Sequence, residues 1–546
     1  MRIDEQRRIE RERERRLQKS RMAQKKDPNQ RQTPGVQAPR KTQKYPDPDR
    51  NFQGISGSSG QQTVLTQPQA QIAKDTFPIE KLFLLLCLVF GCLFVFLTPP
   101  MQAPDEITHF LKSYSLSQMQ LIPKVDENGT VVDEISSEVI DFSNSFGDLQ
   151  YDANAKIDYS SVNSWGDVYT SDTEGDTQQT TYITVNAYII YYIPQALGMA
   201  FAKLMGMSLL WTLYMGRLFN LIFYCIMLYV AIKTTPLAKN LFFLIALTPM
   251  AVFQAASLSY DVMVIAVCVL FTAHMFKLFY DPEAELTSGE FATILILSCI
   301  LIFMKTVYFP LVLLFLAIPK TKFANIKERR HYFFAIVGTS LVVYIIVFIY
   351  RKVVYAGAVS GNSLSTEQII GALSDPNFFF EMISNTFKAF GSNFSEEFIG
   401  KLGWLDTALP PWLITCYYGM LIAALFEFSD YEKSLVNQID GESLVSMLVL
   451  SGIALFAFIV LMFAVFYFIM TLVTLQAEGS SVAQGIQGRY FIPVSFLAFS
   501  MVAVVIHYRT NLSSQIYEMM KKINVGFVAV AQVVSLITMC LRYYVS

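Results

Sequence analysis

Long apolar runs constrain this chain more than any other feature. Stretches of about 20 mostly apolar residues, the length that an α-helix needs to cross a bilayer, recur from Leu82 to the C-terminus. Of the 546 residues only 16% are charged, against roughly 25% in soluble domains. Lipid offers no hydrogen bonds to a backbone, so such runs must be helical. We therefore expect an all-α polytopic integral membrane protein.

The apolar runs within residues 77–546, the predicted multi-pass domain, predict about eleven transmembrane helices. They are expected at about 79–97, 210–232, 240–257, 260–280, 290–304, 305–319, 331–353, 411–428, 444–475, 490–508 and 522–542. The pair 290–304 and 305–319 is short, which predicts broken or tilted helices around a cavity.

The uneven charge distribution predicts the orientation in the membrane. Residues 1–76 combine an Arg-rich opening with Gln, Pro, Gly and Ser, a composition that cannot bury a core and predicts a disordered tail. Its basic excess places the tail in the cytoplasm, where it fits an anionic lipid surface better than nucleic acid. The strongly acidic stretch within 99–209 then becomes the first extracytoplasmic loop, and 354–410 becomes a second.

The apolar segment 186–206 is open to two interpretations. If it spans the membrane, the loop with Lys233 and Lys239 falls outside, against the positive-inside rule. If it lies in the interface as a juxtamembrane helix, that conflict disappears, and its tyrosines suit the interface. We favour the interfacial helix.

Two adjacent carboxylates follow the first predicted span, in the stretch from Pro99 to Phe110. Pro104 is well placed as the first residue of a short helix. Asp105 and His109 would then share one helix face, next to Glu106. The stretch is either a reaction site at the membrane boundary or a solvated helix start.

Several other polar residues are predicted on the same side of the membrane. Lys305 lies inside an apolar run, Asp261 follows a turn between two spans, and Arg489 precedes the tenth span. Ionisable residues in such segments are functional candidates by default. Each also has a simpler explanation: an ion pair of Lys305 with Asp261 or another carboxylate, a snorkelling Arg489 and, for Asp406, a loop cap. We interpret Arg217 as a boundary arginine.

Together, short motifs resemble the DUF2142-type family of bacterial polytopic membrane proteins between about residues 80 and 510. They are Pro104-Asp105-Glu106-x-x-His109-Phe110, Tyr192-Ile193-Pro194-Gln195-Ala196-Leu197-Gly198, Thr248-Pro249-Met250 with Ser257-x-Ser259-Tyr260-Asp261, Lys305-Thr306-x-Tyr308-x-Pro310 and Gln487-Gly488-Arg489-Tyr490-x-x-Pro493. That family is similar to the GT-C glycosyltransferases. The resemblance therefore implies a GT-C-like helical bundle with juxtamembrane helices in a bacterial plasma membrane.

The resemblance also implies an activity: transfer of a sugar from a polyprenyl-phosphate donor to a cell-surface polysaccharide, teichoic acid or glycolipid. Asp105 would be the general base, or a ligand with Glu106 of a divalent metal, and Glu106 or His109 would orient it. Lys305 and Arg489 would hold the donor phosphate. The residues expected to bind the rest of the substrate are Asp261, Tyr308, Asp406 and Gln487.

Two other classes of function remain open from the sequence. Ionisable residues in spans also mark a lipid-linked glycan transporter or flippase. However, we find no internal inverted repeat, and the polar residues gather on one side. A non-catalytic cell-envelope assembly protein would use the acidic loop and basic tail as docking surfaces.

Overall fold

The computed structural model describes residues 78–127, 131–169, 177–181, 189–354, 375–475, 477, 480–509 and 517–545. The chain divides into two units, Met1–Ala73 and Lys74–Ser546, and all described residues belong to the second. The predicted disordered tail, residues 1–76, lies outside the described residues.

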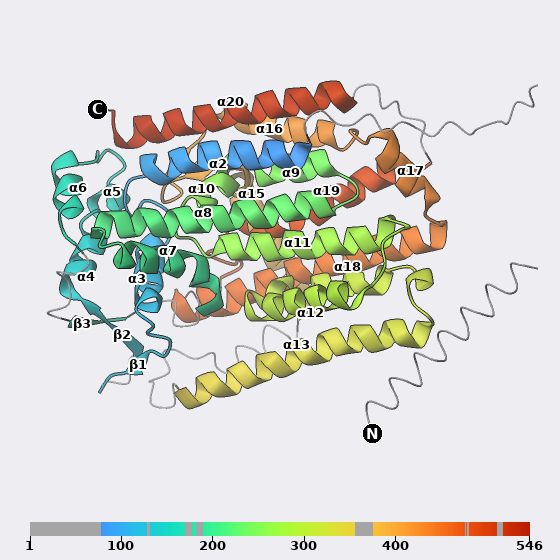
Figure 1. Cartoon of the computed structure of the whole chain (residues 1–546), viewed down its shortest axis with the longest axis horizontal. Coiled ribbons are helices and arrows are strands. Elements are labelled where there is room, and N and C mark those ends of the chain that lie inside the picture. Colours follow the sequence, from blue (N-terminus) through green and yellow to red (C-terminus); the bar gives the residue numbers. More distant parts are fainter. Residues whose placement is uncertain are drawn as a thin grey trace, which may run out of the picture. The chain divides into compact units, whose positions relative to one another are not determined.

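Long apolar helices lie side by side in the second unit (Figure 1). Among the described residues, seven helices are long and apolar enough to cross a membrane. They are α2 (Ile79–Leu97), α8 (Leu209–Thr234), α11 (Asp261–Tyr280), α13 (Ile326–Val354), α18 (Gly441–Val465) with the π-helix η5 (Phe466–Thr474), α19 (Ile492–His507) with the 3₁₀ turn η6 (Gly488–Phe491), and α20 (Tyr517–Tyr543). The prediction of an all-α polytopic membrane protein is confirmed.

The other four predicted spans are shorter elements. They are α12 (Ser288–Phe303), the 3₁₀ helix η3 (Thr306–Ala317), α16 (Pro411–Ala424) and the pair α9 (Lys239–Ala246) and α10 (Pro249–Ala255). The predicted span 240–257 is interrupted because Thr248 caps α10 and Pro249 begins it. Proline has no N–H to continue the preceding helix. The count of about eleven full-length spans is therefore corrected.

The segment predicted as a juxtamembrane helix forms η2 (Ile189–Tyr192) and α7 (Ile193–Leu204). At 16 residues, it is shorter than the roughly 20 that a span needs, which favours the interfacial placement. The chain turns at Gly206 and enters α8, against which α7 packs closely. At Gly198, a Cβ atom would collide with the carbonyl oxygen of Met215 in α8.

Where it is described, the predicted first loop, 99–209, is a folded cap rather than an open connection. Its elements are α3 (Glu106–Ser117), β1 (Lys124–Val125), β2 (Val131–Ser136), α4 (Ser137–Asn144), α5 (Asp148–Tyr151), α6 (Tyr159–Gly166) and β3 (Thr177–Thr181), besides η2 and α7. The three strands form an antiparallel sheet in the order β1-β2-β3. A buried ion pair between Lys112 and Asp133, 3.2 Å apart, fixes β2 to α3. The cap elements gather at one end of the helices (Figure 1).

The predicted second loop, 354–410, is also structured where it is described. Residues Pro376–Ile399 form α15, and a hairpin of β4 (Lys401–Leu402) and β5 (Thr407–Ala408) follows. Helix α17 (Asp430–Gln438) lies at the end of the unit away from α3 and α6, and the 3₁₀ turn η4 (Lys320–Lys322) precedes α13 (Figure 1).

The close contact of α7 with α8 gives a stability prediction. Gly198→Ala forces a methyl group against the Met215 backbone, and overpacking of this kind costs about 1–3 kcal/mol. We expect a lower apparent Tm in detergent. Gly419→Ala is the control, because Gly419 lies in α16 with open space around it. Equal melting of the two variants would contradict the packing described.

Candidate functional site

A buried ion pair lies beneath the motif that follows α2. The Arg217 guanidinium in α8 binds the Glu106 carboxylate with two bonds, Nη2 to Oε2 at 2.6 Å and Nε to Oε1 at 2.9 Å. Both side chains are 0% exposed. Bidentate geometry makes this the strong form of a carboxylate–arginine contact.

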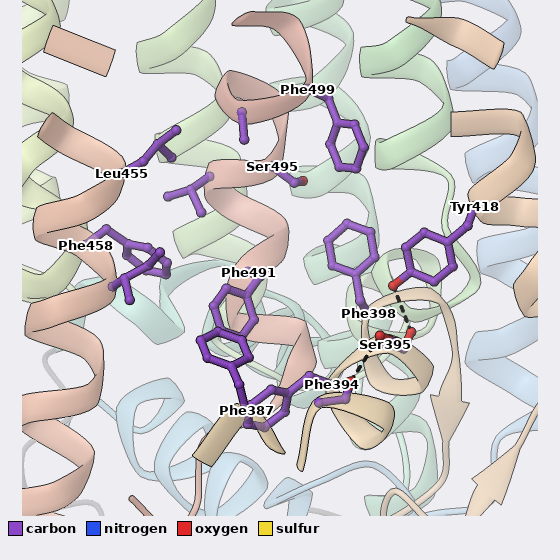
Figure 2. A pocket seen from close by; sticks show the side chains of 14 residues that line it. Phe387, Phe394, Ser395, Phe398, Tyr418, Leu455, Phe458, Phe491, Ser495 and Phe499 are labelled. Carbon is purple, nitrogen blue, oxygen red and sulfur yellow. Dashed lines mark hydrogen bonds between the residues drawn. The ribbon is translucent and has the colours of Figure 1, made fainter. Parts of the chain in front are cut away.

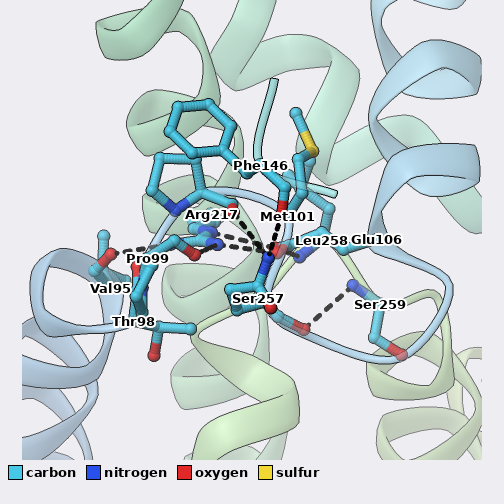
Figure 3. A network of polar contacts seen from close by, with 12 residues as sticks. Val95, Thr98, Pro99, Met101, Glu106, Phe146, Arg217, Ser257, Leu258 and Ser259 are labelled. Carbon is cyan, nitrogen blue, oxygen red and sulfur yellow. Dashed lines mark hydrogen bonds and ion pairs between the residues drawn. The ribbon is translucent and has the colours of Figure 1, made fainter. Parts of the chain in front are cut away.

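The same arginine also binds the end of α2 (Figure 3). Its N–H groups donate to the carbonyl oxygens of Val95, Thr98 and Pro99 at 3.1, 2.7 and 2.9 Å. A helix leaves its last carbonyls without intrahelical partners, and a cation there is favourable. Glu106 also accepts the backbone N–H of Leu258 at 3.1 Å. One ion pair thus joins α2, α3, α8 and the turn before α11.

This anchoring separates the two predicted carboxylates. Asp105 is the N-cap of α3 and has a left-handed backbone (φ 60°), which is unfavourable for a residue with a Cβ atom. Its side chain is 59% exposed, whereas that of Glu106 is fully buried. The position of Glu106 argues against the predicted catalytic or metal-binding role, because its carboxylate oxygens are engaged by Arg217 and Leu258.

Four of the predicted residues meet beside α3. Lys305 Nζ lies 2.7 Å from Asp261 Oδ1, and Arg489 Nε lies 3.4 Å from Asp261 Oδ2. Arg489 Nη2 is in turn 3.6 Å from Asp105 Oδ2. The cluster therefore alternates in charge, from Lys305 through Asp261 and Arg489 to Asp105. The predicted Lys305–Asp261 ion pair is present.

Breaks in the helices place these side chains. Asp261 begins α11, after a turn whose carbonyls at Ser257 and Ser259 accept the Asn220 amide at 2.8 and 3.1 Å. Lys305 occupies the break between α12 and η3. Arg489 lies in η6, which is held to α15 by the bond from Gly488 N to Glu397 Oε2 at 2.6 Å.

Aromatic rings surround the cations. Lys305 Nζ lies 4.1 Å from the ring centroid of Tyr490 and 5.1 Å from that of Tyr260, distances typical of cation–π contacts. The Tyr308 hydroxyl donates to the Tyr490 carbonyl at 2.8 Å, and its ring stacks on Phe458. With 1% exposure, Tyr308 positions the backbone next to Arg489 and has no free hydroxyl hydrogen for the predicted substrate contact.

Arg489 has unused hydrogen-bonding capacity. It is 4% exposed, and its Nη1 hydrogens have no hydrogen-bond acceptor among the described residues, whereas its Nε faces Asp261 Oδ2 at 3.4 Å as an ion pair. The side-chain oxygen of Gln487 is likewise buried without a donor. A guanidinium has five N–H groups, and buried ones normally find partners. The geometry therefore suits an additional anion.

His109 lies on the inner side of this cluster. Its Nδ1 is 3.0 Å from the Tyr192 hydroxyl, and the edge of its ring meets Tyr260. Burial lowers the pKa of His109 from 6.5 to about 4, although Asp105 and Asp261 partly oppose the shift. The imidazole is thus neutral at pH 7, and fixes the tyrosines rather than supplying charge.

Asp406 is not part of the cluster. Its carboxylate pairs with Arg542 at 3.0 Å and accepts the backbone N–H of Trp404 at 3.1 Å. Trp404 Nε1 donates to the Met101 carbonyl at 2.9 Å. These contacts fit the alternative of a loop cap, which attaches the β4–β5 turn to α20, and argue against the predicted substrate contact.

Asp105 and Glu106 were also predicted as ligands of a divalent metal. Among the described residues, no group of three or more His, Cys, Asp or Glu side chains is arranged to hold a metal ion. The Asp105 carboxylate is exposed, whereas the Glu106 carboxylate is buried and bound to Arg217, which argues against the two acting together as metal ligands.

An apolar cavity of about 460 Å³ lies next to η6. Phe491, two residues after Arg489, lines it together with Phe394 of α15 and Phe458 of α18 (Figure 2). Phe458 also stacks on Tyr308, whose hydroxyl binds the carbonyl oxygen of Tyr490 next to Arg489.

A comparison with protein families now identifies the chain at the family level. The model of the DUF2142 family, described as a predicted membrane protein, matches residues 88–498. This chain belongs to the DUF2142 family. The match includes every member of the cluster, from Asp105 to Arg489. No curated protein matches the chain, and no solved structure matches it.

Sequence reasoning missed the partner of Glu106. Arg217 lies in the apolar run of α8, eight residues after its start, which is deeper than a boundary arginine needs to be. A charged residue at such a position requires a partner, and that requirement was the available signal.

The anchor predicts a large stability effect in this DUF2142 protein. Arg217→Met leaves the Glu106 charge buried without a partner, which typically costs about 3–5 kcal/mol. We expect a large fall in apparent Tm and partial recovery in the Glu106→Gln/Arg217→Met double variant. Lys320→Met, which removes an exposed pair with Glu442, is the control. Equal Tm values for Arg217→Met and Lys320→Met would contradict the anchoring role.

His109 gives a pH-dependent prediction. Because its pKa is lowered in the folded state to about 4, its contribution to stability is complete above 6.5 and is lost as pH falls toward 4. The shift corresponds to about 3 kcal/mol at most. We expect the Tm difference between wild type and His109→Gln to shrink over that range. A difference independent of pH would contradict a buried neutral imidazole.

Proposed function

We propose that this protein is a membrane glycosyltransferase that takes a sugar from a polyprenyl-phosphate donor. The acceptor is a cell-surface polysaccharide, teichoic acid or glycolipid on the predicted outer face. The proposal is carried by one observation: the buried Arg489 guanidinium, whose Nη1 has no hydrogen-bond acceptor in the described part of the chain, lies beside the exposed carboxylate of Asp105.

The cations suit the phosphate of the donor. Arg489 offers N–H groups in a planar fork that matches phosphate oxygens, and Lys305 adds a second positive charge through their shared partner Asp261. Positive groups fixed in a dry site stabilise the charge that develops on a leaving group, often the largest catalytic contribution. Asp261 holds both cations in place, and we assign it to positioning rather than to sugar binding.

Asp105 suits the role of general base. The acceptor hydroxyl would give its proton to the Asp105 carboxylate while its oxygen bonds to the anomeric carbon. The bond from that carbon to the phosphate oxygen breaks, and its electron pair leaves with the phosphate, next to Arg489. Asp105 is open to solvent, whereas Arg489 is buried, so acceptor and donor would approach from different sides.

The apolar cavity supports a lipid-linked donor rather than a soluble nucleotide sugar. Phenylalanines from α15, α18, η6 and α19 contribute to its mostly apolar lining, and Phe491 of that lining is two residues from Arg489. If the phosphate binds Arg489, the first isoprenoid units of the donor could pack against this apolar surface. Burial of each CH₂ group there contributes about 0.8 kcal/mol.

The proposal is tested on the surface glycans of cells that lack this protein. We expect a sugar substituent to be missing, and to return with the wild-type gene. Asp105→Asn keeps the shape but removes the base, which typically costs about 10²–10⁴-fold in rate. Arg489→Met should fail similarly. The measurement is mass and linkage analysis of the purified glycan.

Glu442→Gln is the matched control, because it also removes one carboxylate and Glu442 is 88% exposed far from the cluster in sequence. It should restore the glycan fully. Protein abundance in the membrane must be equal for all variants. Full restoration by Asp105→Asn, or an intact glycan in the deletion strain, would contradict the proposal and favour transport or assembly.

A further inference from the structure

A second polar cluster lies at the other end of the helices, where α17 is found (Figure 1). Its centre is Glu427, in the turn between α16 and α17, which is only 5% exposed. Asn240 of α9 and Asn524 of α20 are buried beside it and donate their amides to Oε2 at 2.9 and 2.7 Å. One carboxyl oxygen therefore joins three segments that are far apart in the sequence.

The other carboxyl oxygen has a different environment. Glu427 Oε1 is buried without a hydrogen-bond partner among the described residues. No lysine or arginine of the described part lies within ion-pair distance of this carboxylate, unlike Glu106 or Asp261. An ionised carboxylate buried without a cation is costly.

A proton removes this cost without breaking either amide bond. In a neutral carboxylic acid, one oxygen carries the hydrogen and the other remains a carbonyl acceptor. Oε2 already accepts both amides, so it corresponds to the carbonyl oxygen. Oε1, which has no donor, is the oxygen free to carry the hydrogen.

We propose that Glu427, Asn240 and Asn524 form a proton-binding site that holds α9, α20 and the α16–α17 turn together, with the proton on Oε1. The site is separate from the Asp105 cluster and does not depend on the proposed glycosyltransferase activity. Its ligand is the proton alone.

The electrostatics of the site agree with this geometry. Burial raises the pKa of Glu427 from 4.5 to about 7, against the two amide bonds, which lower it. The nearby carboxylate of Glu432 raises it further. Other charged or titratable side chains of the adjoining elements include Lys239 of α9, Asp430 and Lys433 of α17, His507 of α19, and Glu518, Lys521 and Lys522 of α20.

Protonation of Glu427 should therefore stabilise the packing of α9, α20 and the α16–α17 turn against one another. The pKa of Glu427 in the folded state lies above its ordinary value. The contribution of the bound proton to the stability of the fold is therefore complete below about pH 4.5 and is lost as the pH rises through about 7. The pH dependence of this stabilisation is opposite in sign to that of His109. A comparison with Glu427→Gln, which stays neutral at every pH, isolates the Glu427 contribution.

The test is difference infrared spectroscopy of the full chain in lipid, which detects the C=O stretch of a protonated carboxyl directly. In wild type we expect one such band to disappear with a midpoint near pH 7, and the band to be absent from Glu427→Gln. Identical titrations of the two proteins, or a midpoint for the Glu427 band near 4.5, would overturn the proposal.

A second variant keeps the test valid if Glu427→Gln does not fold. Asn240→Ser removes one amide that favours the ionised form, so the midpoint should rise by about one pH unit. His507→Phe, which retains an aromatic ring to stack on Phe428, should leave the midpoint unchanged. A midpoint that stays fixed in Asn240→Ser, or moves in His507→Phe, would contradict the assignment to Glu427.

Discussion

The ion pair between Arg217 and Glu106 is the interaction on which the rest of the site depends. It is fully buried, and one guanidinium binds a carboxylate together with the last carbonyls of α2. Removing two charges from water is expensive unless every remaining donor and acceptor is paired. Here most of these groups are paired, and the resulting network fixes α2, α3, α8 and the turn before α11.

The unusual backbone of Asp105 follows from this anchoring. Because Glu106 is held in the interior, the residue before it enters α3 through a left-handed conformation and turns its carboxylate to the open side. Two neighbouring carboxylates thus acquire different roles, one structural and one available for chemistry. The turn fixed by Leu258 also leads directly to Asp261, which holds Lys305 and Arg489.

From the sequence, the charged residues of the cluster could be predicted better than the contacts that hold them in place. Lys305 lies in an apolar run and needs an anion, so its pairing with Asp261 followed from the cost of buried charge. The geometry argues against several predicted roles, among them those of Glu106, Tyr308 and Asp406. The pairing of Glu106 with Arg217 and of Asp406 with Arg542 joins segments far apart in the chain, which no local pattern encodes. The depth of Arg217 in α8 signalled only that it needs a partner. The break between α9 and α10 was signalled by Thr248-Pro249, but overall hydropathy concealed it.

In the proposed function, the buried Arg489 receives the phosphate of a lipid donor. The most direct measurement is a cryo-EM structure of the protein with polyprenyl phosphate bound. We predict phosphate oxygens within hydrogen-bonding distance of Arg489, on the side facing Asp105, and the start of the isoprenoid chain against Phe491. A head group bound away from Arg489, or a lipid confined to the outer surface of the helices, would contradict the account.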